Sequence, residues 1–249
     1  MEYGTLYGVG VGPGAPDLMT LRSVNILKSV DVIAIPRRSE KDESLAWKIA
    51  KDNVGDVEGQ ERLFFNFPMV KDPEVLRPAW EIALSGIGER LKEGKSVAFI
   101  TEGDPFVYST FIYLFDEAKK RWPEVNVKIV PAVTSITAVA AVAGIPLADG
   151  AERVAILPAT YGVDDVAEIV DKFDTTILMK VGKTLPQTIE ALEREGCAEK
   201  AYYVSRATME GEKIVHDLNE IEGGKRDYFS MIVVSRRERS GALSGKTKP

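Results

Sequence analysis

One short stretch decides how this chain is interpreted: Glu102-Gly103-Asp104-Pro105-Phe106-Val107-Tyr108-Ser109-Thr110. It follows an apolar run at 96–100, whose β-branched and aromatic residues predict a buried strand. After it, apolar residues recur at helical spacing from 111 to 118. The expected unit is therefore a strand, a turn and a helix. Gly103 supplies a backbone conformation that other residues avoid, and Pro105 is expected to start the helix.

This turn places Asp104 at the carboxyl end of a parallel strand. Open α/β sheets bind their ligands at that edge, where a carboxylate can accept hydrogen bonds from a ligand. An Asp before Pro can equally serve as the cap of the following helix. The turn alone leaves both interpretations open.

The first half of the chain alternates between predicted strands and helices. It opens with an apolar strand at 6–11, a glycine-rich turn at 12–14 and a helix that Thr20 can cap. Further strands are expected at 32–35, 63–69, 96–100 and 127–130, with helices between them. This alternation predicts a parallel sheet with helices on both faces.

The second half starts with the same alternation and then changes. Strands are expected at 154–157, 176–180, 200–205, 213–217 and 230–234, and helices at 166–173 and 185–195. The last three strands have no helices between them, so they should pair antiparallel. We therefore predict an α/β protein of two α/β domains, residues 1–131 with a mostly parallel sheet and residues 132–249 with a mixed sheet. Residues 240–249 are small, polar and basic, and are expected to be disordered.

Composition excludes several classes of protein. The single cysteine, Cys197, rules out an internal disulfide and fits a reducing cytoplasm. The single histidine, His216, argues against a histidine-built metal site and a Ser-His-Asp triad. The start lacks the pattern of a signal peptide, and the longest apolar stretch, 136–148, is too short to cross a bilayer. The net charge of −6 argues against non-specific nucleic-acid binding but permits an anionic ligand at a local basic patch.

The glycine-rich turn also meets a loose dinucleotide-binding pattern, Gly10-x-Gly12-x-x-Ala15. Two features weaken this interpretation. Pro13 removes a backbone donor from the loop, and a phosphate cradle depends on such donors. The acid expected to hold a ribose would be Asp31, which begins the next strand instead of ending it.

Taken together, the turns at the strand ends resemble those of the tetrapyrrole methylases that act in cobalamin and sirohaem synthesis. The resemblance covers nearly the whole chain. The motifs that carry it are Gly10-Val11-Gly12-Pro13-Gly14 with Leu18-Met19-Thr20, Gly103-Asp104-Pro105, residues 131–135 with Ala143-Gly144-Ile145-Pro146-Leu147, and Met179. Residues 103–110 and 151–160 resemble the branch that methylates C-20 of precorrin-2 or cobalt-factor II. The chain departs from the family pattern at Ala15 and at Ala132. The second departure implies a backbone angle there that does not require glycine.

The resemblance implies that S-adenosylmethionine binds in a folded shape in the cleft between the domains, and that S-adenosylhomocysteine is the product. The cofactor contacts carried over from the motifs are Pro13, Gly103, Asp104, Val107, Thr134, Ser135, Met179 and Ala207. Asp104 could accept hydrogen bonds from the methionine amino group or the ribose, and its charge favours the sulfonium. Main-chain groups near Met179 and Ala207 could recognise the adenine edges.

The implied reaction is an in-line displacement by C-20 on the sulfonium methyl group, which needs neither a metal nor a protein nucleophile. Tyr108 is our candidate base for the C-20 proton, although packing at the helix entry is an alternative role. An anionic tetrapyrrole needs cations, for which Arg37, Arg38 and Lys180 are the main candidates. Weaker candidates for substrate contacts are Lys71 and Arg77, and Phe67 and Met69 for the macrocycle face.

Four alternatives remain open: a transferase for another ring position, a diphthine-synthase-like enzyme acting on a protein, a non-catalytic adenosyl-metabolite binder and a nucleotide-dependent oxidoreductase. Whether the substrate contains cobalt is also left open. We expect a homodimer, from the family and because the Phe-rich strand at 63–69 needs cover.

Overall fold

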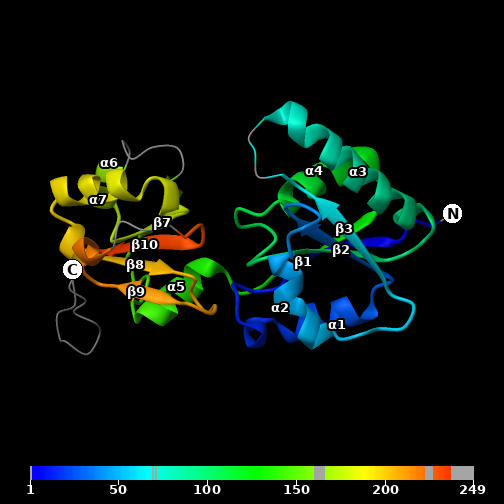
Figure 1. The fold of residues 1–249 in the computed structure, drawn as a ribbon, viewed down its shortest axis with the longest axis horizontal. Helices are drawn as coiled ribbons and strands as arrows, with labels where there is room; N and C mark the ends of the chain where they lie inside the picture. Colours follow the sequence, from blue (N-terminus) through cyan, green and yellow to red (C-terminus); the bar gives the residue numbers. More distant parts are fainter. Residues whose placement is uncertain (1, 69, 71, 160–165, 222–226, 237–249) are drawn as a thin grey trace. The chain divides into compact units, whose positions relative to one another are not determined.

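The computed structural model describes residues 2–68, 70, 72–159, 166–221 and 227–236 of the chain. It divides into two compact units, the first ending at Ser135 and the second beginning at Ile136. Each unit contains one sheet of five strands (Figure 1). The α/β fold class is confirmed, while the domain limits of 1–131 and 132–249 stay a prediction.

The sheet of the first unit is entirely parallel. Its strands lie in the order β3 (Glu61–Asn66), β2 (Val32–Arg37), β4 (Val97–Thr101), β1 (Thr5–Gly10) and β5 (Asn126–Val130). All four neighbouring pairs run parallel, as the alternation of strands and helices predicted. Gly10 at the end of β1 lies opposite Thr101 at the end of β4. The loops that follow these two strands therefore start at the same edge of the sheet.

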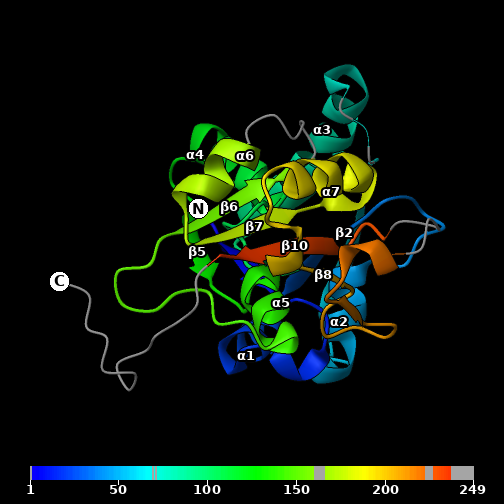
Figure 2. The ribbon, with the colours of Figure 1, turned by 90° about the vertical axis from the view of Figure 1, so that its left-hand side faces the viewer.

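Helices cover both faces of this sheet. On one face lie α1 (Leu21–Ser29) and α2 (Leu45–Val54), and on the other α3 (Pro73–Lys92) and α4 (Phe111–Arg121) (Figures 1 and 2). The core accordingly has two separate apolar clusters, one on each side of the sheet. The predicted cap of α1 is confirmed, because the Thr20 hydroxyl accepts a hydrogen bond of 3.1 Å from the Ser23 amide.

The structure corrects the prediction for the turn after β4. Helix α4 begins at Phe111, so Pro105 does not start it. Pro105 instead lies in a turn that the Val107 amide closes on the Asp104 carbonyl at 3.3 Å. The Ser109 hydroxyl accepts a hydrogen bond of 3.1 Å from the amide of Phe111, the first residue of α4. Ser109 therefore holds the amino-terminal end of this helix, and the helix-cap role considered for Asp104 is wrong.

The structure also shows what covers the Phe-rich strand. Phe65 and Phe67 are 7% and 8% exposed and belong to the core of the first unit. The Phe67 ring lies 4.5 Å from the Trp80 ring of α3, so its side chain serves the core. Of the three phenylalanines in this stretch, Phe64 is exposed. The expectation that these residues need a second copy for cover is therefore wrong for Phe65 and Phe67, since α3 provides it. Met69, Lys71 and Thr160, like the tail at 240–249, lie outside the described residues.

The sheet of the second unit is mixed, as predicted. Its order is β6 (Val154–Pro158), β7 (Thr175–Met179), β10 (Ser230–Ser235), β8 (Ala201–Ser205) and β9 (Lys213–Val215). Strands β6 and β7 are parallel, and the remaining pairs are antiparallel. Helices α6 (Val166–Lys172) and α7 (Leu185–Arg194) lie on one face and α5 (Ser135–Ala143) on the other (Figures 1 and 2). Within the described ranges, no helix has both the length and the apolar character needed to span a membrane.

Candidate functional site

Glycines join the loops at the carboxyl edge of the parallel sheet. The Gly103 amide donates to the Gly12 carbonyl at 2.8 Å, and the two residues form an isolated antiparallel bridge. Both have left-handed backbones, with φ of +87° at Gly12 and +63° at Gly103, which residues with a Cβ rarely adopt. A Cβ on Gly10 would lie 2.4 Å from the Gly103 carbonyl oxygen and 2.6 Å from the Ala132 Cβ. The predicted turns after β1, β4 and β5 therefore come together at one place.

Asp104 ties two of these loops to each other. One carboxylate oxygen accepts the Phe106 amide at 2.9 Å, and the other accepts the Ala132 amide at 3.0 Å. Each oxygen has a further lone pair, so both can still accept a hydrogen bond from a ligand. Ala132 is absent from the described residues with positive φ, as its departure from the family glycine implied. Contact between Asp104 and the cofactor stays a prediction.

The other predicted cofactor residues of the first unit flank these loops. Pro13 lies in the bend after Gly12, and Val107 lies in the turn that Asp104 begins. The Ser135 amide lies 4.0 Å from where a Cβ on Gly103 would be, so the segment with Thr134 and Ser135 approaches the Gly-Asp-Pro turn. Helix α1 also holds the end of β1, because the Ser23 hydroxyl donates to the Gly10 carbonyl at 2.8 Å.

Tyr108 has an unusual backbone. Its φ is +52°, in the left-handed region where bulky side chains are uncommon, and the residue is 45% exposed. Strained residues of this kind gather at functional sites, because strain persists only where the surroundings impose it. Nothing in the sequence around Tyr108 signals this angle. Its role as a base stays a prediction.

The two predicted substrate arginines differ in their surroundings. Arg37 is the last residue of β2, and its Nε donates to the Asn66 side chain at 2.8 Å. The Arg37 guanidinium also lies over the Phe64 ring at 5.0 Å. Arg38, the next residue, has an exposed side chain. Arg77 is exposed on α3. The pKa of Glu81 is lowered mainly by its hydrogen bond with Arg121, and the charge of Arg77 adds a smaller lowering.

Glu102, which lies directly before Gly103, was not among the residues predicted for the site. Glu102 is exposed as a residue, but protein atoms crowd its carboxyl, and desolvation, the largest effect, raises its pKa. The amide of Ala46 at the start of α2 and the positive charge of Arg38 oppose this rise in pKa. Glu102 and Arg38 thus influence each other at the edge where the predicted site lies.

Asp31, the residue that a dinucleotide site would need, lies at the opposite edge of the sheet. It precedes β2, and one carboxylate oxygen accepts the Ser96 amide at 2.8 Å and the Ser96 hydroxyl at 2.7 Å. Both hydrogen bonds lower the pKa of Asp31. Asp31 is therefore a structural residue. This argues against a nucleotide-dependent oxidoreductase, which would need an acid at the carboxyl edge to bind the ribose.

In the second unit, the predicted residues lie at one edge of the mixed sheet. Met179 ends β7 opposite Met231, and Ser205 ends β8 opposite Ser230 at the start of β10. Lys180 and Ala207 follow these two strand ends, so this edge gathers Met179, Lys180 and Ala207. Lys180 has a left-handed backbone, with φ of +58°, and burial lowers the pKa of its ammonium group.

Comparisons with known proteins agree with this fold. Residues 5–222 match the family model described as Tetrapyrrole (Corrin/Porphyrin) Methylases. The chain is 40% identical to a probable cobalt-precorrin-2 C(20)-methyltransferase of Methanocaldococcus jannaschii, over 94% of this chain and 97% of that protein. It is 34% identical to the cobalt-precorrin-2 C(20)-methyltransferase of Salmonella typhimurium, again over 94% and 97%.

A solved structure supports the fold alone. The uroporphyrin-III C-methyltransferase of Thermus thermophilus, complexed with S-adenosylhomocysteine, matches with a TM-score of 0.66 at 21% identity. The match covers 94% of this chain and 98% of that one. The family model matches most of the chain, and both relatives are similar over nearly their whole length. This chain belongs to the tetrapyrrole (corrin/porphyrin) methylase family.

Proposed function

We propose that this protein transfers the methyl group of S-adenosylmethionine to C-20 of precorrin-2 or cobalt-factor II in corrin biosynthesis. One observation carries the proposal: the loops after β1, β4 and β5 are locked together through Gly12, Gly103, Asp104 and Ala132. These are the loops that the family resemblance assigns to the cofactor. The names of the two relatives support C-20 as the methylated position.

The residues of the first unit fit an adenosyl cofactor. Left-handed glycines leave main-chain groups open to a close ligand, and Asp104 retains acceptor capacity and negative charge for the amino group and the sulfonium. When bound, S-adenosylmethionine supplies an electrophilic methyl group. The proposed contacts remain those of the motifs: Pro13, Gly103, Asp104, Val107, Thr134, Ser135, Met179 and Ala207. Their task is to orient the cofactor and exclude water.

For the tetrapyrrole, we propose that Arg38 and Lys180 provide charge for the carboxylates. Arg37 contributes less, because Asn66 and Phe64 already hold its guanidinium. Tyr108 is proposed to take the proton that leaves C-20, with its left-handed backbone fixing the direction of the side chain.

The proposal includes a homodimer that works in the cytoplasm, with domains at 1–131 and 132–249. Exposed apolar side chains at Val75, Ile82 and Tyr113 of α3 and α4 support a partner better than the Phe-rich strand does. The single cysteine, which is free and buried, agrees with a reducing compartment.

One assay tests the function. The protein is incubated with labelled S-adenosylmethionine and with either metal-free precorrin-2 or cobalt-factor II. We expect one macrocycle to gain the mass of one methyl group with a change in its absorption spectrum. Binding of the cofactor without transfer to either macrocycle would favour the non-catalytic binder, and transfer to a protein would favour the diphthine-synthase-like branch.

A further inference from the structure

The loop after β8 has a strained backbone on both sides of Ala207. Arg206 has φ of +54° and Thr208 has φ of +64°, both in the left-handed region. Residues with a Cβ adopt this conformation at a cost in free energy, and it persists only where other contacts impose it. The contacts that hold this loop therefore decide the conformation of Ala207.

Arg206 makes several of those contacts, while the Thr208 amide, in the peptide that follows Ala207, donates to the Glu212 carboxylate at 2.6 Å. The Arg206 amide donates to the Phe229 carbonyl at 2.8 Å, and its Nε donates to the Glu210 carbonyl at 2.7 Å. Its Nη1 lies 3.4 Å from an Asp227 carboxylate oxygen. The side chain thus closes its own loop through Glu210 and attaches that loop to the segment before β10.

Asp227 extends this connection to the loop after β7. Its other carboxylate oxygen accepts the Phe229 amide at 2.9 Å, and its carbonyl accepts the Ser230 hydroxyl at 2.8 Å. A Cβ on Gly182 would lie 2.5 Å from the Asp227 carbonyl oxygen, so the loop that begins at Lys180 packs directly against Asp227. The Arg206–Asp227 pair therefore connects the loop after β8, which contains Ala207, to the segment before β10. That segment packs in turn against the loop that follows Met179.

We infer that Arg206 is a positioning residue for the adenosyl cofactor, which holds the main chain of Ala207 through the Glu210 carbonyl and Asp227. The inference rests on the proposed function. Ala207 has no polar side-chain atom, so a polar contact at this position uses its peptide groups. Peptide groups recognise a ligand well only if the free protein already holds them in the bound geometry.

The second unit contains a matched control at the other end of its sheet. Nη1 of Arg236, which follows β10, donates to the Val170 carbonyl at 2.9 Å and to the Asp171 carboxylate at 2.8 Å. Ser235, the residue before it, pairs with Thr175 at the start of β7. Arg236 thus binds one carbonyl and one carboxylate, as Arg206 does, but at the edge of the sheet opposite to Met179.

The test compares Arg206→Gln with Arg236→Gln by calorimetric titration of S-adenosylhomocysteine and by steady-state kinetics. For Arg206→Gln we expect the dissociation constant and the KM for S-adenosylmethionine to rise about tenfold, because the loop loses its fixed geometry. At saturating cofactor, kcat and the KM for the tetrapyrrole should stay within about twofold. Arg236→Gln should leave cofactor affinity within about twofold while lowering the melting temperature similarly.

Arg206→Lys and Asp227→Asn keep the inference testable if Arg206→Gln fails to fold. Lysine cannot bind Glu210 and Asp227 with a planar fork, and asparagine removes the charge opposite Arg206, so each should give an intermediate loss of cofactor affinity. If the wild-type enzyme is active and the folded Arg206 variants bind the cofactor with unchanged affinity, this inference is wrong while the proposed function stands. Equal losses in the Arg206 and Arg236 variants would also overturn it, as a general effect of stability. If the wild-type protein binds no adenosyl ligand, the proposed function and this inference fall together.

Discussion

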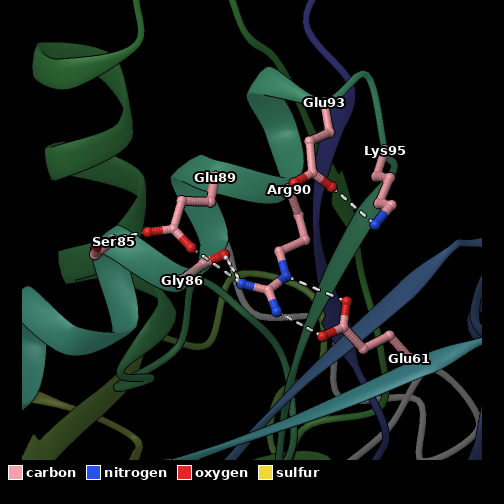
Figure 3. A network of polar contacts seen from close by, with 7 residues as sticks. All are labelled: Glu61, Ser85, Gly86, Glu89, Arg90, Glu93 and Lys95. Carbon is pink, nitrogen blue, oxygen red and sulfur yellow. Dashed lines mark hydrogen bonds and ion pairs between the residues drawn. The ribbon is translucent and has the colours of Figure 1, made fainter.

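The two edges of the parallel sheet are built differently. At the amino edge, side chains pair with one another: Arg90 binds Glu61 through two hydrogen bonds of 2.6 and 3.2 Å, and Lys95 binds Glu93 at 2.8 Å (Figure 3). At the carboxyl edge, the loops are joined mainly through the backbone, by the Gly12–Gly103 bridge and by main-chain amides that Asp104 accepts.

The difference concerns what each edge leaves open to a ligand. At the amino edge, the charged groups of Glu61 and Arg90 satisfy each other, so they offer little to a ligand. At the carboxyl edge, side chains such as Tyr108 and Arg38 remain exposed, and the backbone of Tyr108 is left-handed. Strain at one edge requires stability from elsewhere. Substitutions at the two edges should therefore have opposite profiles, affecting ligand affinity at one and stability at the other.

Gly10→Ala should have the largest effect. The new Cβ would lie 2.4 Å from the Gly103 carbonyl oxygen, a backbone atom that cannot rotate away, so the loops after β1 and β4 must separate. We expect S-adenosylhomocysteine affinity to fall by about a hundredfold or more, and stability by about 1–3 kcal/mol as in other overpacked sites. Calorimetry and thermal unfolding measure both. Gly59→Ala is the control, because its φ of +76° is strained but its Cβ would meet nothing within 4 Å. A Gly10→Ala protein that binds as tightly as the control would show that the loops need not meet.

Asp104→Ala should come next. The variant loses a charge-assisted hydrogen bond to the cofactor, worth about 1.5–3 kcal/mol, and so should bind S-adenosylmethionine more than about tenfold more weakly while still folding. It also releases the Ala132 amide. Asp104→Asn separates the two roles, since it keeps one acceptor oxygen for an amide but removes the charge that favours the sulfonium. Calorimetry that shows unchanged affinity in folded Asp104→Ala would remove Asp104 from the site.

Replacing Arg37 and Arg38 together with Ala should have a moderate effect on the substrate alone. We expect a higher KM for the tetrapyrrole, most clearly at low salt, where charges are less screened, and cofactor affinity within about twofold. The single variants sharpen this expectation: Arg38→Ala should reproduce most of the rise, because Asn66 and Phe64 already engage Arg37. Steady-state kinetics at two salt concentrations measure the effect. A loss of cofactor affinity with an unaltered tetrapyrrole KM would place the substrate elsewhere.

The sequence predicted what local patterns determine. Most strands and helices were found where apolar periodicity and Thr20 placed them, and the left-handed Gly103 followed from the residue type. The strand expected at 63–69 lies instead at Glu61–Asn66, and α4 begins at Phe111 and not at Pro105. Contacts between distant residues were missed, such as Asp104 with Ala132, 28 positions apart, and Arg206 with Asp227, 21 positions apart. The cover of Phe65 and Phe67 by α3 and the φ of Tyr108 also depend on tertiary packing, which no local pattern encodes.

Glu61→Gln at the amino edge should have the smallest effect, and only on stability. Hydrogen bonds from Arg90 lower the pKa of Glu61 in the folded protein, so the pair stabilises the fold above the unfolded pKa of Glu61 and this contribution is lost as pH falls through the folded value. Both side chains are partly exposed, at 24% for Arg90 and 35% for Glu61, so solvent screening limits the loss at pH 7 to about 1 kcal/mol or less. Urea unfolding at pH 7 and at about pH 3 should show a wild-type advantage that shrinks in acid, since Glu61 of the unfolded chain is then largely protonated and part of the contribution is lost. The exposed Glu58→Gln serves as the control for removing one negative charge. Cofactor affinity should not change, and a loss of it in Glu61→Gln would mean that the two edges of the sheet are coupled.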